Sequence, residues 1–167
     1  MQDEADSVSS RDIHPFPSKS PSTSSRLVVD CEAMNIQVAV VCDAAADYGG
    51  KLNILGAFDT IFAASFPATH PQCAIALRLV FQRIEEGSHK LRLNFVNEDG
   101  RFVLPSIEIP VEVVFPGDVS DLVRNFIFNI QQLKFDQPGQ YAIDLALDGR
   151  QEASILIRVQ QQQGAST

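Results

Sequence analysis

Few side chains in this sequence could take part in acid–base or nucleophilic catalysis. Between residues 34 and 160 the only histidines are His70, which precedes a proline, and His89, which follows a Glu-Glu-Gly-Ser turn. A nucleophile needs a base within hydrogen-bond reach and a group that orients that base. Neither histidine belongs to a Gly-x-Ser-x-Gly elbow, a Gly-rich phosphate loop or a His-Glu-x-x-His pair. We therefore expect no catalytic residues, with an enzyme of unrecognised type as an alternative.

Potential metal ligands are also sparse. His70 and Cys73 are spaced like two zinc ligands, but a zinc site needs four ligands and the sequence has no second Cys/His pair. Calcium prefers oxygen ligands, and several predicted loops carry aspartates. These are Asp43, Asp47, Asp99, Asp118, Asp121, Asp136 and Asp148. Most stand one per turn, which turn chemistry alone explains. We expect no cofactor, and the alternative is a calcium or small-molecule site built from loops at one end.

Three basic residues are candidates for binding. Residues 73–83 and 89–97 are predicted to pair as a hairpin, which would place Arg78, Lys90 and Arg92 in one stripe on the outward face. Such a stripe on an acidic domain could dock an acidic partner, although a solvated face is its ordinary explanation.

The strands that would position these residues show a period of two. The clearest pattern begins at a Pro-Gly corner before Tyr141, continues through alternating apolar residues to an Asp148-Gly149 turn, and returns over 152–159. Tyrosines at such corners in sandwiches bond their hydroxyl back to the upstream backbone. Similar segments recur from residue 34 onward with turn signals about every ten residues. The pattern predicts an all-β fold, an antiparallel two-sheet β-sandwich of the immunoglobulin-like or Greek-key type with about 7–9 strands. A barrel is the alternative.

One strand is marked as an edge. Residues 102–115 read as extended but contain Pro105 and Pro110. Proline cannot donate to a ladder, so this segment is predicted to be an edge strand or to cross between the sheets.

Composition sets the domain limits. Residues 1–33 are rich in serine and proline and lack periodicity, which predicts a disordered tail. Two interpretations stay open: a real flexible arm, or a gene-start artefact upstream of a natural start at Met34. The sandwich is predicted to occupy residues 34–160, and residues 161–167 are expected to form a second disordered tail.

Charge and cysteine usage exclude some functions. The formal net charge of −8 argues against a sequence-independent grip on nucleic acid or on an anionic membrane. The sequence shows no secretory signal, and no apolar run approaches the roughly 20 residues that span a bilayer. The three cysteines show no paired spacing, and Cys42 and Cys73 fall in apolar strand patterns, where thiols usually behave as buried hydrophobes. A reducing cytoplasm fits best.

The sequence also resembles a family of small, uncharacterised bacterial proteins. The resemblance rests on a strand ending in Asp43, the segment Gly-Lys-Leu-Asn-Ile-Leu-Gly-Ala-Phe at 50–58, and the Gly139-x-Tyr141 and Asp148-Gly149 pairs. It covers roughly residues 34–159 and implies no activity and no functional residues. We therefore expect a non-catalytic protein-binding or assembly module, whose partner is another protein or a second copy of the chain.

Overall fold

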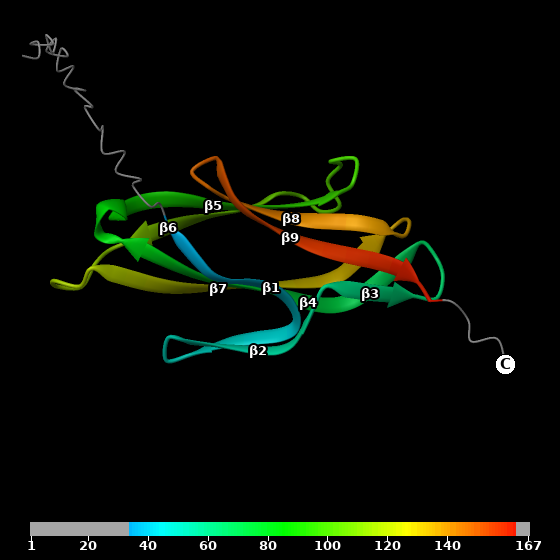
Figure 1. The fold of residues 1–167 in the computed structure, drawn as a ribbon, viewed down its shortest axis with the longest axis horizontal. Helices are drawn as coiled ribbons and strands as arrows, with labels where there is room; N and C mark the ends of the chain where they lie inside the picture. The colour runs from blue at the N-terminus through cyan, green and yellow to red at the C-terminus, as the bar shows by residue number, and fades with distance from the viewer. Residues whose placement is uncertain (1–33, 163–167) are drawn as a thin grey trace, which may run out of the picture. The chain divides into compact units, whose positions relative to one another are not determined.

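The computed structural model describes residues 34–162, which form nine strands and one short 3₁₀ turn in two stacked layers (Figure 1). The elements are β1 (Asn35–Tyr48), β2 (Lys51–Phe58), β3 (Thr60–Ala63), β4 (Ala68–Gln82), η1 (Arg83–Glu85), β5 (Gly87–Asn97), β6 (Ile107–Val113), β7 (Asp121–Phe135), β8 (Gly139–Leu147) and β9 (Arg150–Gln161). In this part of the chain no helix is long and apolar enough to span a membrane.

The strands form two sheets. One has the order β2-β1-β4-β7 and the other the order β3-β9-β8-β5-β6. All strand pairs are antiparallel except β3 and β9, which run parallel. The predicted all-β, two-sheet sandwich and its strand number are therefore confirmed. Of the predicted tails, 1–33 and 163–167 lie outside the described residues. The predicted boundary at 161 is wrong by one residue, because Gln161 is the last residue of β9.

The main core lies between the sheets and is built from alternate residues of the long strands. A cluster of three aromatic rings links the layers. The ring centroid of Phe135 in β7 lies 4.9 Å from that of Tyr141 in β8 and 6.1 Å from that of Phe95 in β5, and both pairs are edge to face. The Tyr141 hydroxyl donates to the Gln137 carbonyl at 2.8 Å. This confirms the predicted tyrosine corner.

The predicted hairpin between residues 73–83 and 89–97 is wrong. β4 pairs with β1 and β7, whereas β5 pairs with β6 and β8 in the opposite sheet. The η1 turn carries the chain from one layer to the other. Both strands show the same alternation because both face the same core. A period of two reports which face is buried, not which strand is the neighbour.

The first strand also departs from simple alternation. A bulge between Ile36 and Val38 shifts the register, so that Ile36, Ala39 and Val41 face the main core. Val40 and Cys42 then face the other way, toward a second apolar cluster. An extra residue in one strand reverses every later side chain, and the sequence pattern alone does not locate it.

That second cluster holds the β1–β2 hairpin against the outer side of β4 and β7. Cys42, Ala74 and Ala76 are fully buried there. The partly buried residues packed against them are Val40, Ala45, Leu52 and Ile127. The alanines leave room for the hairpin to approach β4 and β7 closely. Figure 1 shows β1 bending toward its end before the chain returns as β2.

One glycine in this hairpin is required by its geometry. Gly56 has φ +63°, and a Cβ built on it would lie 2.1 Å from Asp43 Oδ2. We expect Gly56→Ala to lower the free energy of unfolding by about 1–2 kcal/mol from the left-handed backbone alone, and by more from the clash. Chemical denaturation of Gly56→Ala with and without Asp43→Ala separates the two causes. Equal stability of Gly56→Ala and the parent would contradict this account.

The predicted edge strand is confirmed. β6 is the last strand of the five-stranded sheet, and its Pro110 lies opposite Lys90 of β5. The missing N–H of Pro110 removes one donor from this strand.

Candidate functional site

The structure does not bring the three predicted basic residues into one stripe. Arg78 lies on β4 in the four-stranded sheet, while Lys90 and Arg92 lie on β5 in the other sheet. The two basic residues of β5 share one carboxylate: Glu108 lies 2.5 Å from Arg92 Nε and 3.7 Å from Lys90 Nζ. One carboxylate balances only one of these two positive charges. The stripe of three residues, which depended on the wrong hairpin, does not form.

Arg78 contacts its own chain. Its guanidinium donates to the Gln37 side chain, the Gly50 carbonyl and the Asn125 side chain, each at 3.0 Å. Asn125 in turn donates to Asp47 at 2.7 Å. These hydrogen bonds attach the turn between β1 and β2 to β4 and β7. Arg78 therefore stabilises the fold of its own chain.

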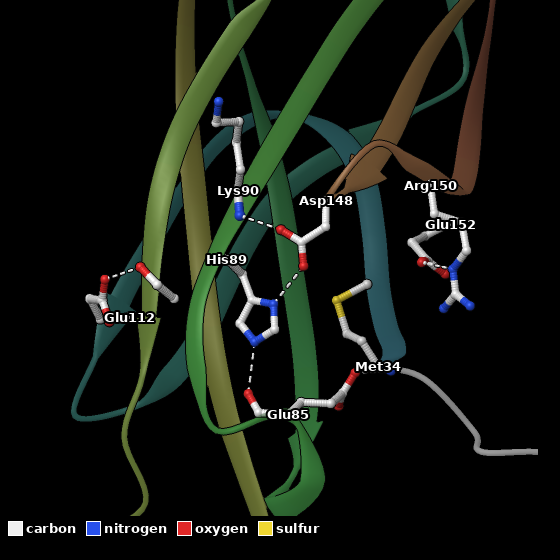
Figure 2. Close-up of polar contacts among 9 residues, drawn as sticks. Met34, Glu85, His89, Lys90, Glu112, Asp148, Arg150 and Glu152 are labelled. Carbon is white, nitrogen blue, oxygen red and sulfur yellow. Dashed lines mark hydrogen bonds and ion pairs between the residues drawn. The ribbon is translucent and has the colours of Figure 1, made fainter.

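The most organised polar cluster surrounds His89 at the end of the sandwich where β5 begins (Figure 2). His89 Nδ1 lies 2.7 Å from Asp148 in the β8–β9 turn, and Nε2 lies 2.8 Å from the Glu85 carbonyl oxygen. The other Asp148 oxygen accepts from the Lys90 backbone N–H at 2.8 Å. The Glu85 carboxylate accepts from the backbone N–H groups of Met34 and Gln82. The His89 ring thus joins two connections of the chain, η1 and the β8–β9 turn, and the Glu85 carboxylate adds the start of β1.

The electrostatics of this cluster favour a charged imidazole. Both ring nitrogens face oxygen acceptors, and only the doubly protonated ring can donate to both. Partial burial works to lower the pKa of His89, but the hydrogen bonds to Asp148 and Glu85 outweigh it and raise the pKa above 6.5. Burial works to raise the pKa of Asp148, and the bonds from His89 and Lys90 lower it overall. Both shifts favour the charged forms of His89 and Asp148.

This arrangement resembles half of a catalytic triad, but its second ring nitrogen is already bonded. A base in a triad keeps Nε2 available to take a proton from the nucleophile. Here Nε2 is held by a backbone carbonyl, and the neighbouring hydroxyl of Ser88 is bonded to Glu112 instead. The geometry therefore makes His89 a clamp between the η1 turn and the β8–β9 turn.

The two described thiols and Nε2 of the second histidine are all buried. Cys42 and Cys73 are buried and free, as the sequence predicted. Burial, with the neighbouring Cys42 and Asp43, raises the pKa of Cys73 to about 11, so it stays a thiol at neutral pH. His70 Nε2 is buried and has no hydrogen-bond partner among the described residues. Residues 34–162 contain no group of three or more His, Cys, Asp or Glu side chains placed to hold a metal.

A cleft of about 500 Å³ opens at the other end of the sandwich. Its lining includes Asp99, Arg101, Lys134 and Asp136, with the Tyr141 corner at one side. Two of the aspartates that the sequence singled out therefore meet in one hollow. They share it with two cations, and two carboxylates fall short of the six to eight oxygens that calcium takes.

An exposed apolar row crosses the outer face of the five-stranded sheet. Phe102 bridges to Val96, Val96 pairs with Ala142, and Ala142 pairs with Leu156. Directly opposite residues lie on one face of a sheet, so these four form a continuous line. Phe102 is 64% exposed and Leu156 is 63% exposed. We call these four residues the apolar row.

The sequence pattern alone does not reveal the apolar row. Its only signal was an apolar residue at an outward position of a strand, as with Leu156 between the inward-facing Ile155 and Ile157. That signal is weak because single exposed apolar residues are ordinary on protein surfaces. Only the register shows that the row is contiguous.

These observations define an all-β sandwich whose polar clusters hold its own turns and whose exposed face carries an apolar row. The chain belongs to the family of unknown function DUF6941, whose model matches residues 37–160. This confirms the resemblance to an uncharacterised domain family. No curated protein matches the sequence.

Two solved structures show distant likeness. One is the alkylpurine DNA glycosylase AlkC of Pseudomonas fluorescens bound to DNA containing an abasic site analogue, at 8% identity and a TM-score of 0.43, covering 76% of this chain and 30% of that one. The other is a glycosyl hydrolase family 2 member from Bacteroides cellulosilyticus, at 15% identity and a TM-score of 0.33, covering 54% of this chain and 13% of that one. This chain spans less than a third of either protein.

Proposed function

We propose that this protein is a non-catalytic protein-binding module that docks its partner on the apolar row. The observation that carries the proposal is the row itself: two large apolar side chains, each more than 60% exposed, joined by Val96 and Ala142 across three strands. Contiguous exposed apolar surface marks interaction sites more often than isolated residues do.

The surroundings of the apolar row support a protein partner. The neighbouring register on one side is polar, with Asn94 opposite Asp144 and Asp144 opposite Ser154. On the other side Gln140 lies opposite Arg158. An apolar centre with a polar rim is the usual anatomy of a protein–protein interface. Burying Phe102 and Leu156 would contribute about 1.5–3 kcal/mol each.

A cleft lies at each end of the apolar row. Phe102 lines the 500 Å³ cleft, and Leu156 lines a shallower cleft of about 330 Å³ together with Val40 and Phe58. A partner that lays an apolar strand or helix along the row could insert one anchoring side chain at each end.

We expect Phe102→Ser combined with Leu156→Ser to abolish partner binding while the domain stays folded. The test compares proteins captured from a native-cell lysate by the parent, by this double variant and by the control Ile84→Ser, which removes an apolar residue that is 73% exposed and lies outside the row. A protein retained by parent and control but lost with the double variant supports the proposal. A captured set that is the same for all three would refute it.

The 500 Å³ cleft supports a second candidate, the binding of a small ligand. Arg101 and Lys134 oppose Asp99 and Asp136 in this hollow, which suits a molecule carrying both charges. Thermal melts with and without zwitterionic ligands test this candidate, since a specific ligand must raise the melting temperature. A melting temperature unchanged by every ligand would leave the cleft without support.

We also propose a cytoplasmic location. The support is that both described thiols, Cys42 and Cys73, are free and buried, which suits a reducing compartment. Fractionation of the native cell tests it, and recovery of the protein outside the cytoplasm would overturn it.

A further inference from the structure

The longest free edge of the described sandwich belongs to β7. This strand has 15 residues and pairs only with β4. Within residues 34–162 no backbone hydrogen bond runs along its other side. An edge of this kind presents a row of unpaired N–H and C=O groups, which is a template for another strand.

The other three edges are each protected. β6 contains Pro110, β3 has only four residues, and β2 is interrupted by Gly56 with its positive φ. Short edges, prolines and kinks are the usual means by which proteins prevent strand addition. β7 has neither proline nor glycine, and its one irregular residue, Gln132 with φ 55°, lies near its end.

Apolar side chains at this edge are incompletely covered. Phe126 and Phe128 pack against the main core but remain only half-buried, in contrast to the fully buried Phe81 of the neighbouring strand β4. Both belong to the inward face of β7. A strand added beside β7 would cover them, and their burial would favour its addition.

We propose that β7 pairs with β7 of a second copy, antiparallel, with the two-fold axis near Phe128. The two four-stranded sheets then form one continuous eight-stranded sheet. Self-pairing is isologous, so every contact occurs twice. This inference goes beyond the proposed function, because it uses a different sheet and a different partner.

Charge complementarity selects a second copy as the occupant. β7 begins at Asp121 and carries Lys134 one residue before its end. With the axis at Phe128, antiparallel pairing places Asp121 of each copy opposite Phe135 of the other, one residue along the strand from Lys134. Parallel pairing would instead bring like charges together. Opposite charges fix orientation and register at an interface more than they add affinity.

The first test is the mass of the full chain in solution. Analytical ultracentrifugation over a concentration series is expected to show a reversible dimer of twice 18.3 kDa. Hydrogen exchange is expected to show β7 amides gaining protection with concentration while β6 amides do not. A monomer at every concentration, or a dimer with unchanged β7 exchange, would overturn the proposal.

Variants then test the register. Asn129 is exposed and lies next to the proposed axis, so Asn129→Lys places two like charges together and is expected to raise the dimer dissociation constant at least about tenfold. The matched control is Gln160→Lys, an exposed position on the other sheet, which is expected to leave the constant unchanged.

Charge reversal provides the sharpest variant test. Asp121→Lys and Lys134→Asp are each expected to weaken the dimer, and the double variant is expected to restore it. Absence of rescue in a double variant with a parent-like circular dichroism spectrum would contradict the antiparallel register. None of these variants changes a residue of the apolar row, although Lys134 lines the cleft beside Phe102. Failure of the dimer test with Asn129→Lys therefore leaves the proposed function standing, and failure of the partner-binding test leaves the dimer standing.

Discussion

Truncation of Phe135 to alanine is expected to lower the free energy of unfolding by about 3–5 kcal/mol. Phe135 is 1% exposed and lies edge to face against Phe95 and Tyr141 of the opposite sheet. Its removal leaves a cavity at the point where β7, β5 and β8 meet, and a packed core relaxes only in part. Urea or guanidinium denaturation, with the slope of the transition compared between proteins, measures the loss.

The matched control is another phenylalanine that the structure leaves in solvent. Phe102→Ala removes the same ring from a side chain that is 64% exposed. We expect it to change stability by no more than about 0.5 kcal/mol. A large loss at Phe102 would show that this ring stabilises the fold, which would contradict a role of the apolar row as a docking surface.

Loss of the His89 clamp is the second large effect, and it depends on pH. We expect His89→Gln to lower the free energy of unfolding by about 1–2 kcal/mol near pH 5, less than a fully buried charged hydrogen bond because the Asp148 side chain is 52% exposed. The His89 ring also stacks on Phe81, with 6.0 Å between the two ring centroids. Denaturation of both proteins between pH 3 and pH 9 measures the difference.

The sign of the pH dependence follows from the two pKa shifts. The pKa of His89 is raised above 6.5, so its contribution is fully present below pH 6.5 and is lost as the pH rises through the folded value. The pKa of Asp148 is lowered below 3.8, so its contribution is present above pH 3.8 and is lost as the pH falls through the folded value. The clamp is therefore strongest between about pH 3.8 and pH 6.5.

An NMR titration checks the cause directly. The His89 ring is expected to titrate above pH 6.5 in the parent and at a lower pH in Asp148→Asn, because the carboxylate bond is the largest cause that raises its pKa. Titration of the parent ring at or below 6.5 would contradict the clamp.

The fold class could be predicted from the sequence because it depends on local signals. Alternation placed Ile143, Leu145 and Ile157 in the core, and turn chemistry located the tyrosine corner at Tyr141. Pro110 marked an edge strand because proline lacks a donor. Each of these inferences concerns a residue and its nearest neighbours in the chain.

Strand pairing could not be predicted in the same way. β4 and β5 face one core from opposite sheets, and their pattern is the same as that of a hairpin. That ambiguity produced the wrong stripe of Arg78, Lys90 and Arg92. The apolar row could not be predicted for a related reason. Phe102 and Leu156 are far apart in the sequence, and only the register of β5, β8 and β9 places them in one line on the same face.

The central claim is that the apolar row is where a protein partner binds. The most direct measurement is the dissociation constant of the captured partner for the parent, for the Phe102→Ser and Leu156→Ser double variant, and for the Ile84→Ser control. Two anchors of about 1.5–3 kcal/mol each predict a loss of affinity of at least about 100-fold for the double variant. The control is expected to bind like the parent. Equal affinity of the double variant and the parent would contradict the claim.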